Sequence, residues 1–124
     1  MTTSSKSQSD QLPLYVTAYQ HQLYLYKLVH NFSKTYKYTL GQELLNLHWQ
    51  MLDLIILANS LLNSDKPPHI KKASLVFDQY KYRVKMAYDL KLISSAKYGY
   101  IMTVHEEMGK MLTGWLRWAK KQSA

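Results

Sequence analysis

The stretch QYKYRVKMAYDL, residues 79–90, decides whether the most basic part of the chain forms a strand or a helix. From Lys81 to Met86, basic and apolar residues alternate, as they do in a half-buried strand. A wider window shows apolar residues at the helical spacings of three and four, running through the same stretch: Ile70, Ala73, Phe77, Tyr80, Val84 and Ala87. A strand would break this row, so we predict a helix over residues 68–93.

Three further segments show the same spacing and predict helices over residues 13–33, 40–63 and 95–121. The row of the first is Leu14, Ala18, His21, Leu25, Leu28 and Phe32. The row of the second is Leu44, His48, Met51, Ile55, Ala58 and Leu62. The row of the last is Tyr98, Ile101, His105, Met108, Leu112, Trp115 and Ala119.

The ends of these helices also have local sequence signals. Thr39 and Gln42 have the spacing of a capping box, and Ser94 and Ser95 offer an N-cap. Pro67 and Pro68 suit the first turn of a helix, where proline is tolerated. Because the connections are short, we expect an all-α fold, an antiparallel up-down-up-down four-helix bundle, with one domain over residues 13–121.

The remaining N-terminal residues, 1–12, begin with MTTSSKSQSD and have no apolar segment of the signal-peptide type, so we expect a disordered tail. No apolar run is long enough to cross a membrane. The chain has no cysteine, which excludes disulfides and thiol chemistry and is compatible with the cytoplasm, where we expect the protein. The helix over 40–63 is apolar around most of its circumference, so we expect subunits to associate through it.

Charge is the main functional signal. Sixteen Lys and Arg against eight Asp and Glu give a net charge of +8, which indicates a polyanionic partner. On the helix over 68–93, Lys81 and Lys85 lie one turn apart with Lys71 and Asp78 in the same sector, and Arg83 lies on the opposite flank. We expect Lys81 and Lys85 to repel each other, with no acid between them to relieve the repulsion, a cost that an acidic partner would reverse.

A second group of cations lies on the last helix and contains Lys110, Arg117 and Lys121. We treat it as a secondary contact, because Glu106 and Lys110 have the spacing of an ordinary ion pair. Of the many aromatic residues, most fall on core rows. Only Tyr36, Tyr38 and Tyr82 are candidates for surface aromatics that could stack on bases.

Catalytic and metal-binding patterns are missing from the sequence. His21, His48 and His105 fall on core rows, so we expect packed histidines with one hydrogen bond each. The helices do not carry the paired Glu-x-x-His motifs of a di-iron bundle, and the phosphate-cradling and nucleophile-elbow motifs are absent. We therefore expect no catalytic residue, no metal, no cofactor and no enzymatic activity.

Three blocks together resemble a known family: KYTLGQELLNLHWQMLDLIILAN (37–59), KMAYDLKLIS (85–94) and EEMGKMLTGWLRW (106–118). In order and spacing they are similar to the Avd family, the accessory variability determinants of diversity-generating retroelements. That family lies within a wider group of four-helix proteins similar to those encoded by ribosomal RNA intervening sequences. The resemblance covers roughly residues 12–120.

The resemblance implies a non-enzymatic accessory protein that assembles into a barrel-like homopentamer with a basic central channel. It implies two partners, the retroelement's reverse transcriptase and its template RNA, with DNA or an RNA/DNA hybrid as further nucleic-acid candidates. The corresponding third-helix cations here are Lys81 and Lys85, where relatives often carry arginine. Lysine keeps the charge but lacks the bidentate geometry of arginine toward phosphate.

Two alternatives remain open at the level of sequence. One is a structural four-helix interaction module of the intervening-sequence type, with no nucleic-acid role, whose basic faces are merely solvated. The other is a helical adaptor or antitoxin that neutralises an acidic partner protein.

Overall fold

The computed structural model describes residues 12–123, and every regular element in this part of the chain is helical. Four long helices are α2 (Pro13–His30), α4 (Leu40–Ser60), α5 (Lys66–Asp89) and α6 (Ser95–Ser123). Two short elements lie in the connections, α3 (Lys34–Lys37) and the single-turn 3₁₀ helix η1 (Asn63–Asp65). The tail expected at residues 1–12 lies, apart from Leu12, outside the described residues.

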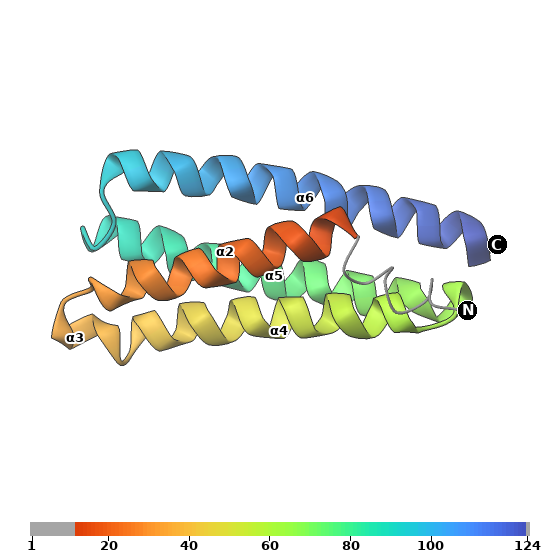
Figure 1. The fold of residues 1–124 in the computed structure, drawn as a ribbon, viewed down its shortest axis with the longest axis horizontal. Coiled ribbons are helices and arrows are strands. Elements are labelled where there is room, and N and C mark those ends of the chain that lie inside the picture. The colour runs from red at the N-terminus through yellow and green to blue at the C-terminus, as the bar shows by residue number, and fades with distance from the viewer. Residues whose placement is uncertain (1–11, 124) are drawn as a thin grey trace.

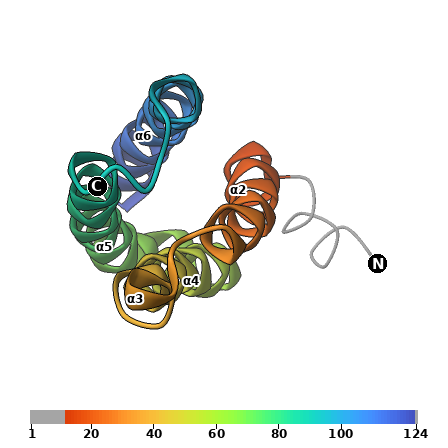
Figure 2. The same ribbon diagram turned by 90° about the vertical axis from the view of Figure 1, so that its left-hand side faces the viewer.

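The long helices run in alternating directions along a common axis (Figure 1). Seen from the end, they follow one another around an arc in the order α2, α4, α5, α6 (Figure 2). The most extensive packing is between α4 and α5 in the middle of the arc, and α2 also contacts α6. Within residues 12–123, no helix is both long and apolar enough to cross a lipid bilayer.

The predicted apolar rows form the core. The rows of α2 and α5 are buried along their whole length, from Leu14 to Phe32 and from Ile70 to Ala87. On α6 the predicted row is buried or packed against the core throughout. On α4 the row is buried except for Leu62, which is 75% exposed because the helix ends at Ser60.

Several predicted boundaries are wrong by a few residues. The first helix stops at His30 and a separate turn, α3, follows, and the third helix starts at Lys66 and stops at Asp89. The capping box predicted at Thr39 and Gln42 does not form. Because α3 precedes α4, the Thr39 hydroxyl donates to the Thr35 carbonyl at 3.3 Å and the Gln42 amide to the Lys37 carbonyl at 3.5 Å.

The N-cap predicted before the last helix is confirmed. The main-chain N–H of Lys97 donates a hydrogen bond of 3.2 Å to the Ser94 hydroxyl oxygen. This bond satisfies one of the free N–H groups that every helix start leaves unpaired.

Lys66 caps the C-terminal end of α4. The sequence pattern did not suggest this role. Its side chain is buried, and its Nζ donates to the carbonyl oxygens of Ala58 at 3.1 Å, Asn59 at 3.3 Å and also Leu61. A cation at this position satisfies the unpaired carbonyls and the negative end of the helix dipole. Burial lowers the pKa of this ammonium group.

The end of α5 has a non-glycine residue in the left-handed region, Lys91, with φ of 64°. The Leu92 N–H donates to the Ala87 carbonyl and the Lys91 N–H to the Tyr88 carbonyl, both at 2.9 Å. This pair of hydrogen bonds is a Schellman motif, in which the left-handed position is normally occupied by glycine.

Lys91→Gly is therefore expected to raise the free energy of unfolding by about 1 kcal/mol, because glycine adopts positive φ without the steric cost of a Cβ. Urea denaturation of the purified protein measures this change. Lys97→Gly is the matched control, because it removes the same charge from a helical position of α6 and should lower stability. A Lys91→Gly variant that is less stable than the parent would contradict this account of the α5 end.

Candidate functional site

A groove of about 990 Å³ runs between α5 and α6, and the cations predicted on the two helices meet in it. Lys81 and Lys85 line it from α5, and Lys110 and Arg117 line it from α6. We call this feature the α5–α6 groove. Four of the predicted site residues, which the sequence assigned to two separate groups, thus lie along one surface.

The other three predicted site residues do not line the groove. Lys71 is exposed on α5 about three turns before Lys81, and Lys121 is exposed in the last turn of α6. Arg83 turns toward α4, where its Nε lies 3.4 Å from the Glu43 carboxylate. Arg83 therefore does not lie with Lys81 and Lys85 in the groove.

Lys81 is held in place by two contacts on its own helix. Its Nζ lies 3.3 Å from the Asp78 carboxylate and 4.5 Å from the centre of the Phe77 ring. The Lys81 side chain is 40% exposed, so it retains access to solvent while its position is defined. The Phe77 ring is buried, which anchors this cation to the core.

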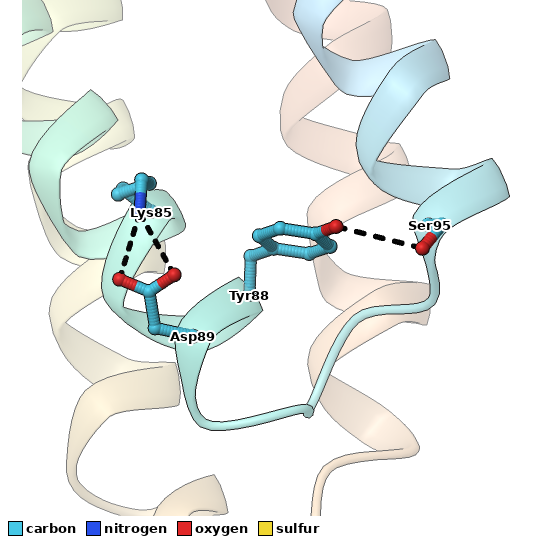
Figure 3. A network of polar contacts seen from close by, with 4 residues as sticks. All are labelled: Lys85, Tyr88, Asp89 and Ser95. Carbon is cyan, nitrogen blue, oxygen red and sulfur yellow. Dashed lines mark hydrogen bonds and ion pairs between the residues drawn. The ribbon is translucent and has the colours of Figure 1, made fainter.

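Lys85 is also paired. Its Nζ lies 2.8 Å from both oxygens of the Asp89 carboxylate (Figure 3). The hydrogen bond to Asp89 raises the pKa of Lys85. No acid lies between the two lysines, as the sequence shows, but each has an aspartate partner on the same helix, and these partners offset the expected repulsion.

Two carboxylates, Asp78 and Glu106, line the groove together with the four cations, so the positive groups outnumber the negative ones two to one. The predicted ion pair between Glu106 and Lys110 is not among the ion pairs of residues 12–123. Lys110 and Arg117 are both exposed. These two cations of α6 are thus held by no carboxylate in the described part of the chain.

The groove also contains aromatic and glycine residues besides the predicted cations. Tyr82, a predicted surface aromatic, lines it and is 75% exposed. Tyr98, which the helical row assigned to the core, lines it too, with its ring stacked on Tyr88 at 4.0 Å and 9°. Gly109 and Gly114 lie along the same wall. Two glycines in the interior of one helix cost stability, and this was the signal available in the sequence.

Next to the groove, a polar network is buried in the core around Tyr80. The Tyr80 hydroxyl lies 2.7 Å from His21 Nε2 and 2.9 Å from His105 Nε2. His48 Nδ1 lies 2.7 Å from the Gln22 side-chain oxygen, so this ring nitrogen carries the proton and donates. The prediction of packed histidines with one hydrogen bond each is confirmed.

The three buried histidines, His21, His48 and His105, are neutral at neutral pH. Burial lowers the pKa of His21 to about 4 and that of His105 to about 3, with nearby charges adding to the effect at His105. Burial also lowers the pKa of His48 well below its ordinary value. The second ring nitrogen of each histidine has no hydrogen-bond partner, and no cluster suited to a metal ion occurs within residues 12–123.

The stability of the fold should therefore fall with acidification. The folded pKa values lie below the ordinary 6.5, so the unfolded chain binds protons first as the pH drops through 6.5 toward 4. Each such histidine lowers the free energy of unfolding by up to about 1.4 kcal/mol per pH unit in this window. Urea denaturation at several pH values between about 7 and 5 measures the slope.

The contribution of one histidine can be isolated with His105→Leu. This variant removes one titrating group, so the slope of the free energy of unfolding against pH should fall by the contribution of one proton. Met108→Leu is the control, because Met108 is buried on the same helix, does not titrate, and exchanges with leucine at little cost. Equal slopes for His105→Leu and the parent would show that His105 does not titrate as the structure implies.

The fold and the groove together define an all-α protein of four packed helices with a cation-lined surface groove and a buried polar network. A sequence model of the bAvd-like family, the bacterial Avd proteins, matches residues 17–119, and the chain belongs to this family. The resemblance seen in the sequence blocks is thereby confirmed. Neither the curated proteins nor the solved structures include a significant match to the chain.

Proposed function

We propose that this protein is a non-enzymatic accessory factor of a diversity-generating retroelement. In this role it binds the reverse transcriptase and the template RNA or its cDNA in the cytoplasm and supports mutagenic reverse transcription. Membership in the bAvd-like family supports association with such a polymerase. It also supports an accessory role without catalysis.

The observation that carries the nucleic-acid part of the proposal is the convergence of Lys81, Lys85, Lys110 and Arg117 on the α5–α6 groove. Helices that are separated by a loop contribute to one cationic surface, on a chain whose net charge is already +8. Such a surface attracts polyanions at long range and concentrates them at the groove.

The side chains of the groove are suited to phosphate. Three of its four cations are lysines, which offer compact point charges, and neither asparagine nor glutamine, the usual partners of adenine, lines the groove within the described residues. We therefore propose binding that depends on the phosphate backbone and has little sequence preference.

Phosphate-dominated binding must weaken steeply with salt. The double variant Lys81→Glu/Lys85→Glu should reduce affinity for a structured RNA by at least roughly tenfold at low salt, and it should flatten the salt dependence. Fluorescence anisotropy across a salt series measures both quantities. Asp78→Asn should have the opposite effect, since it releases Lys81 from its ion pair at 3.3 Å.

The matched control is Lys27→Glu/Lys34→Glu, which makes the same change in net charge at exposed lysines of α2 and α3, away from the groove. Similar losses for the two double variants would mean that overall charge acts and that the groove has no special part. An affinity that is insensitive to salt would show that phosphates do not dominate the binding.

We further propose that the chain assembles into a homopentamer, as the family resemblance implies. The support from this chain is an outward apolar row on α2, spaced by three, four and three residues: Val16, Tyr19, Leu23 and Tyr26. The wide apolar surface of α4 supports association of subunits less strongly than the sequence suggested. Most of its apolar residues pack inside the chain, because α4 contacts α2, α3 and α5.

Multi-angle light scattering should therefore give a mass about five times that of the chain, and Tyr19→Glu/Leu23→Glu should shift it toward the monomer. Charges placed in a buried apolar interface cannot be solvated, which is the reason for dissociation. Ile56→Glu/Leu57→Glu, at exposed apolar positions of α4, is the comparison. If only the α4 variant dissociates, the interface lies on α4, as the sequence predicted, and the role given to α2 is wrong.

The alternative of a structural module without nucleic acid has one observation in its favour. Lys81, Lys85 and Arg83 each have a carboxylate partner in the structure, as cations of a merely solvated face would. The salt series separates the two hypotheses. A reverse-transcriptase gene beside near-identical template and variable repeats would favour the retroelement, and a position inside a ribosomal RNA gene would favour the structural module.

A further inference from the structure

We infer that the α5–α6 groove holds one unpaired nucleic-acid strand, with bases stacked on Tyr82 and Tyr98 and phosphates on the four groove cations. This inference rests on the proposed function, because it specifies which form of nucleic acid enters the groove. A duplex could contact only the rim. The assignment follows from the width of the groove, its aromatic residues, its glycines and the distribution of its charges.

The width of the groove is set by two neighbouring helices of one chain. Packed helices have axes roughly 8–10 Å apart, so the depression between them is narrow. A double helix is much wider than this spacing and has its phosphates on a convex outer surface. Half-buried lining residues such as Met102 and Gly109 would not touch a duplex, whereas a single strand could reach them.

The aromatic residues supply surfaces on which bases can stack. Tyr82 is 75% exposed, so its ring is accessible to a base from solvent. Tyr98 is fixed by its stacking on Tyr88, whose hydroxyl lies 3.5 Å from the Ser95 hydroxyl (Figure 3). Stacking on aromatic side chains between cations is the usual way in which proteins hold unpaired strands without sequence readout.

The glycines keep the groove open. A Cβ built on Gly114 would have no atom within 4 Å, and one on Gly109 would lie 3.8 Å from the Phe77 ring. Packing therefore does not require glycine at either position, and each glycine lowers helix stability by about 1 kcal/mol relative to alanine. The absence of side chains at these two positions leaves space along this wall of α6.

The charges in the groove match the lower charge density of a single strand. Duplex DNA carries one charge per about 1.7 Å of axis, twice the density of one strand. Asp78 and Glu106 interrupt the row of cations, and they would repel a closely spaced double row of phosphates. A single strand can place its phosphates at the cations and its bases over the tyrosines.

The test compares two fluorescent probes on the full-length protein at the same salt concentration. One probe is an unstructured oligouridylate of roughly 15 nucleotides, and the other is an RNA hairpin of the same total length that is paired except for its short loop. The single strand is expected to bind at least about tenfold more tightly. Tyr82→Leu should weaken its binding roughly fivefold or more, and Tyr82→Phe should retain it, because phenylalanine keeps the stacking face.

Gly114→Leu is the sharpest variant, because it should fill the groove and block the single strand while stabilising the helix. A raised melting temperature would show that the loss of binding is not a loss of fold. Tyr100→Leu, at a half-exposed tyrosine of α6 that does not line the groove, is the control and should bind both probes like the parent.

The outcomes distinguish a failure of the proposed function from a failure of this inference alone. If the parent protein binds neither probe, the nucleic-acid part of the proposed function fails and this inference fails with it. If the hairpin binds as tightly as the single strand, the inference alone is wrong. It is also wrong if Tyr82→Leu and Gly114→Leu bind the single strand like the parent.

Discussion

The hydroxyl group of Tyr80 fixes the arrangement of the helices on which the candidate site depends. It is fully buried on α5 and bonds His21 of α2 and His105 of α6, so one oxygen joins three of the four long helices. These bonds form in only one rotation of α5 about its axis. Since Lys81 follows Tyr80 directly and Lys85 lies one turn further along, the same rotation turns both lysines toward the α5–α6 groove.

This constraint has a cost that an apolar core would not have. Each histidine of the network leaves one buried ring nitrogen without a hydrogen bond, and such a group costs free energy that packing alone must offset. Leucine at these positions would let the helices slide, because apolar contacts tolerate many registers. In a bundle whose charges lie on neighbouring helices, a register error would separate the cations. We interpret the network as a device that favours one register at some expense of stability.

Periodicity in the sequence was enough to predict the four helices, their buried rows and the packed histidines, because burial follows a regular spacing. It could not predict where cations end up once helices pack. Arg83 pairs with Glu43, which lies on α4, and no local pattern connects these two residues. The groove escaped prediction for the same reason. Its two sides come from α5 and α6. Its glycines and Tyr98 can be recognised as groove residues only once the packing of these two helices is known.

In the proposed function, the ion pairs of Lys81 and Lys85 influence the affinity of the groove for anionic ligands. Exposed ion pairs of this kind add little to stability, so an incoming phosphate can exchange with Asp78 or Asp89 at little cost. Until that exchange, the aspartates hold each lysine at a defined place on α5 and reduce the entropy lost on binding. They also weaken the attraction for small anions, whereas a polyanion that bridges both lysines and the free cations of α6 gains from all of them together. In the proposed function, the groove would therefore favour a long charged ligand such as a strand over a single phosphate.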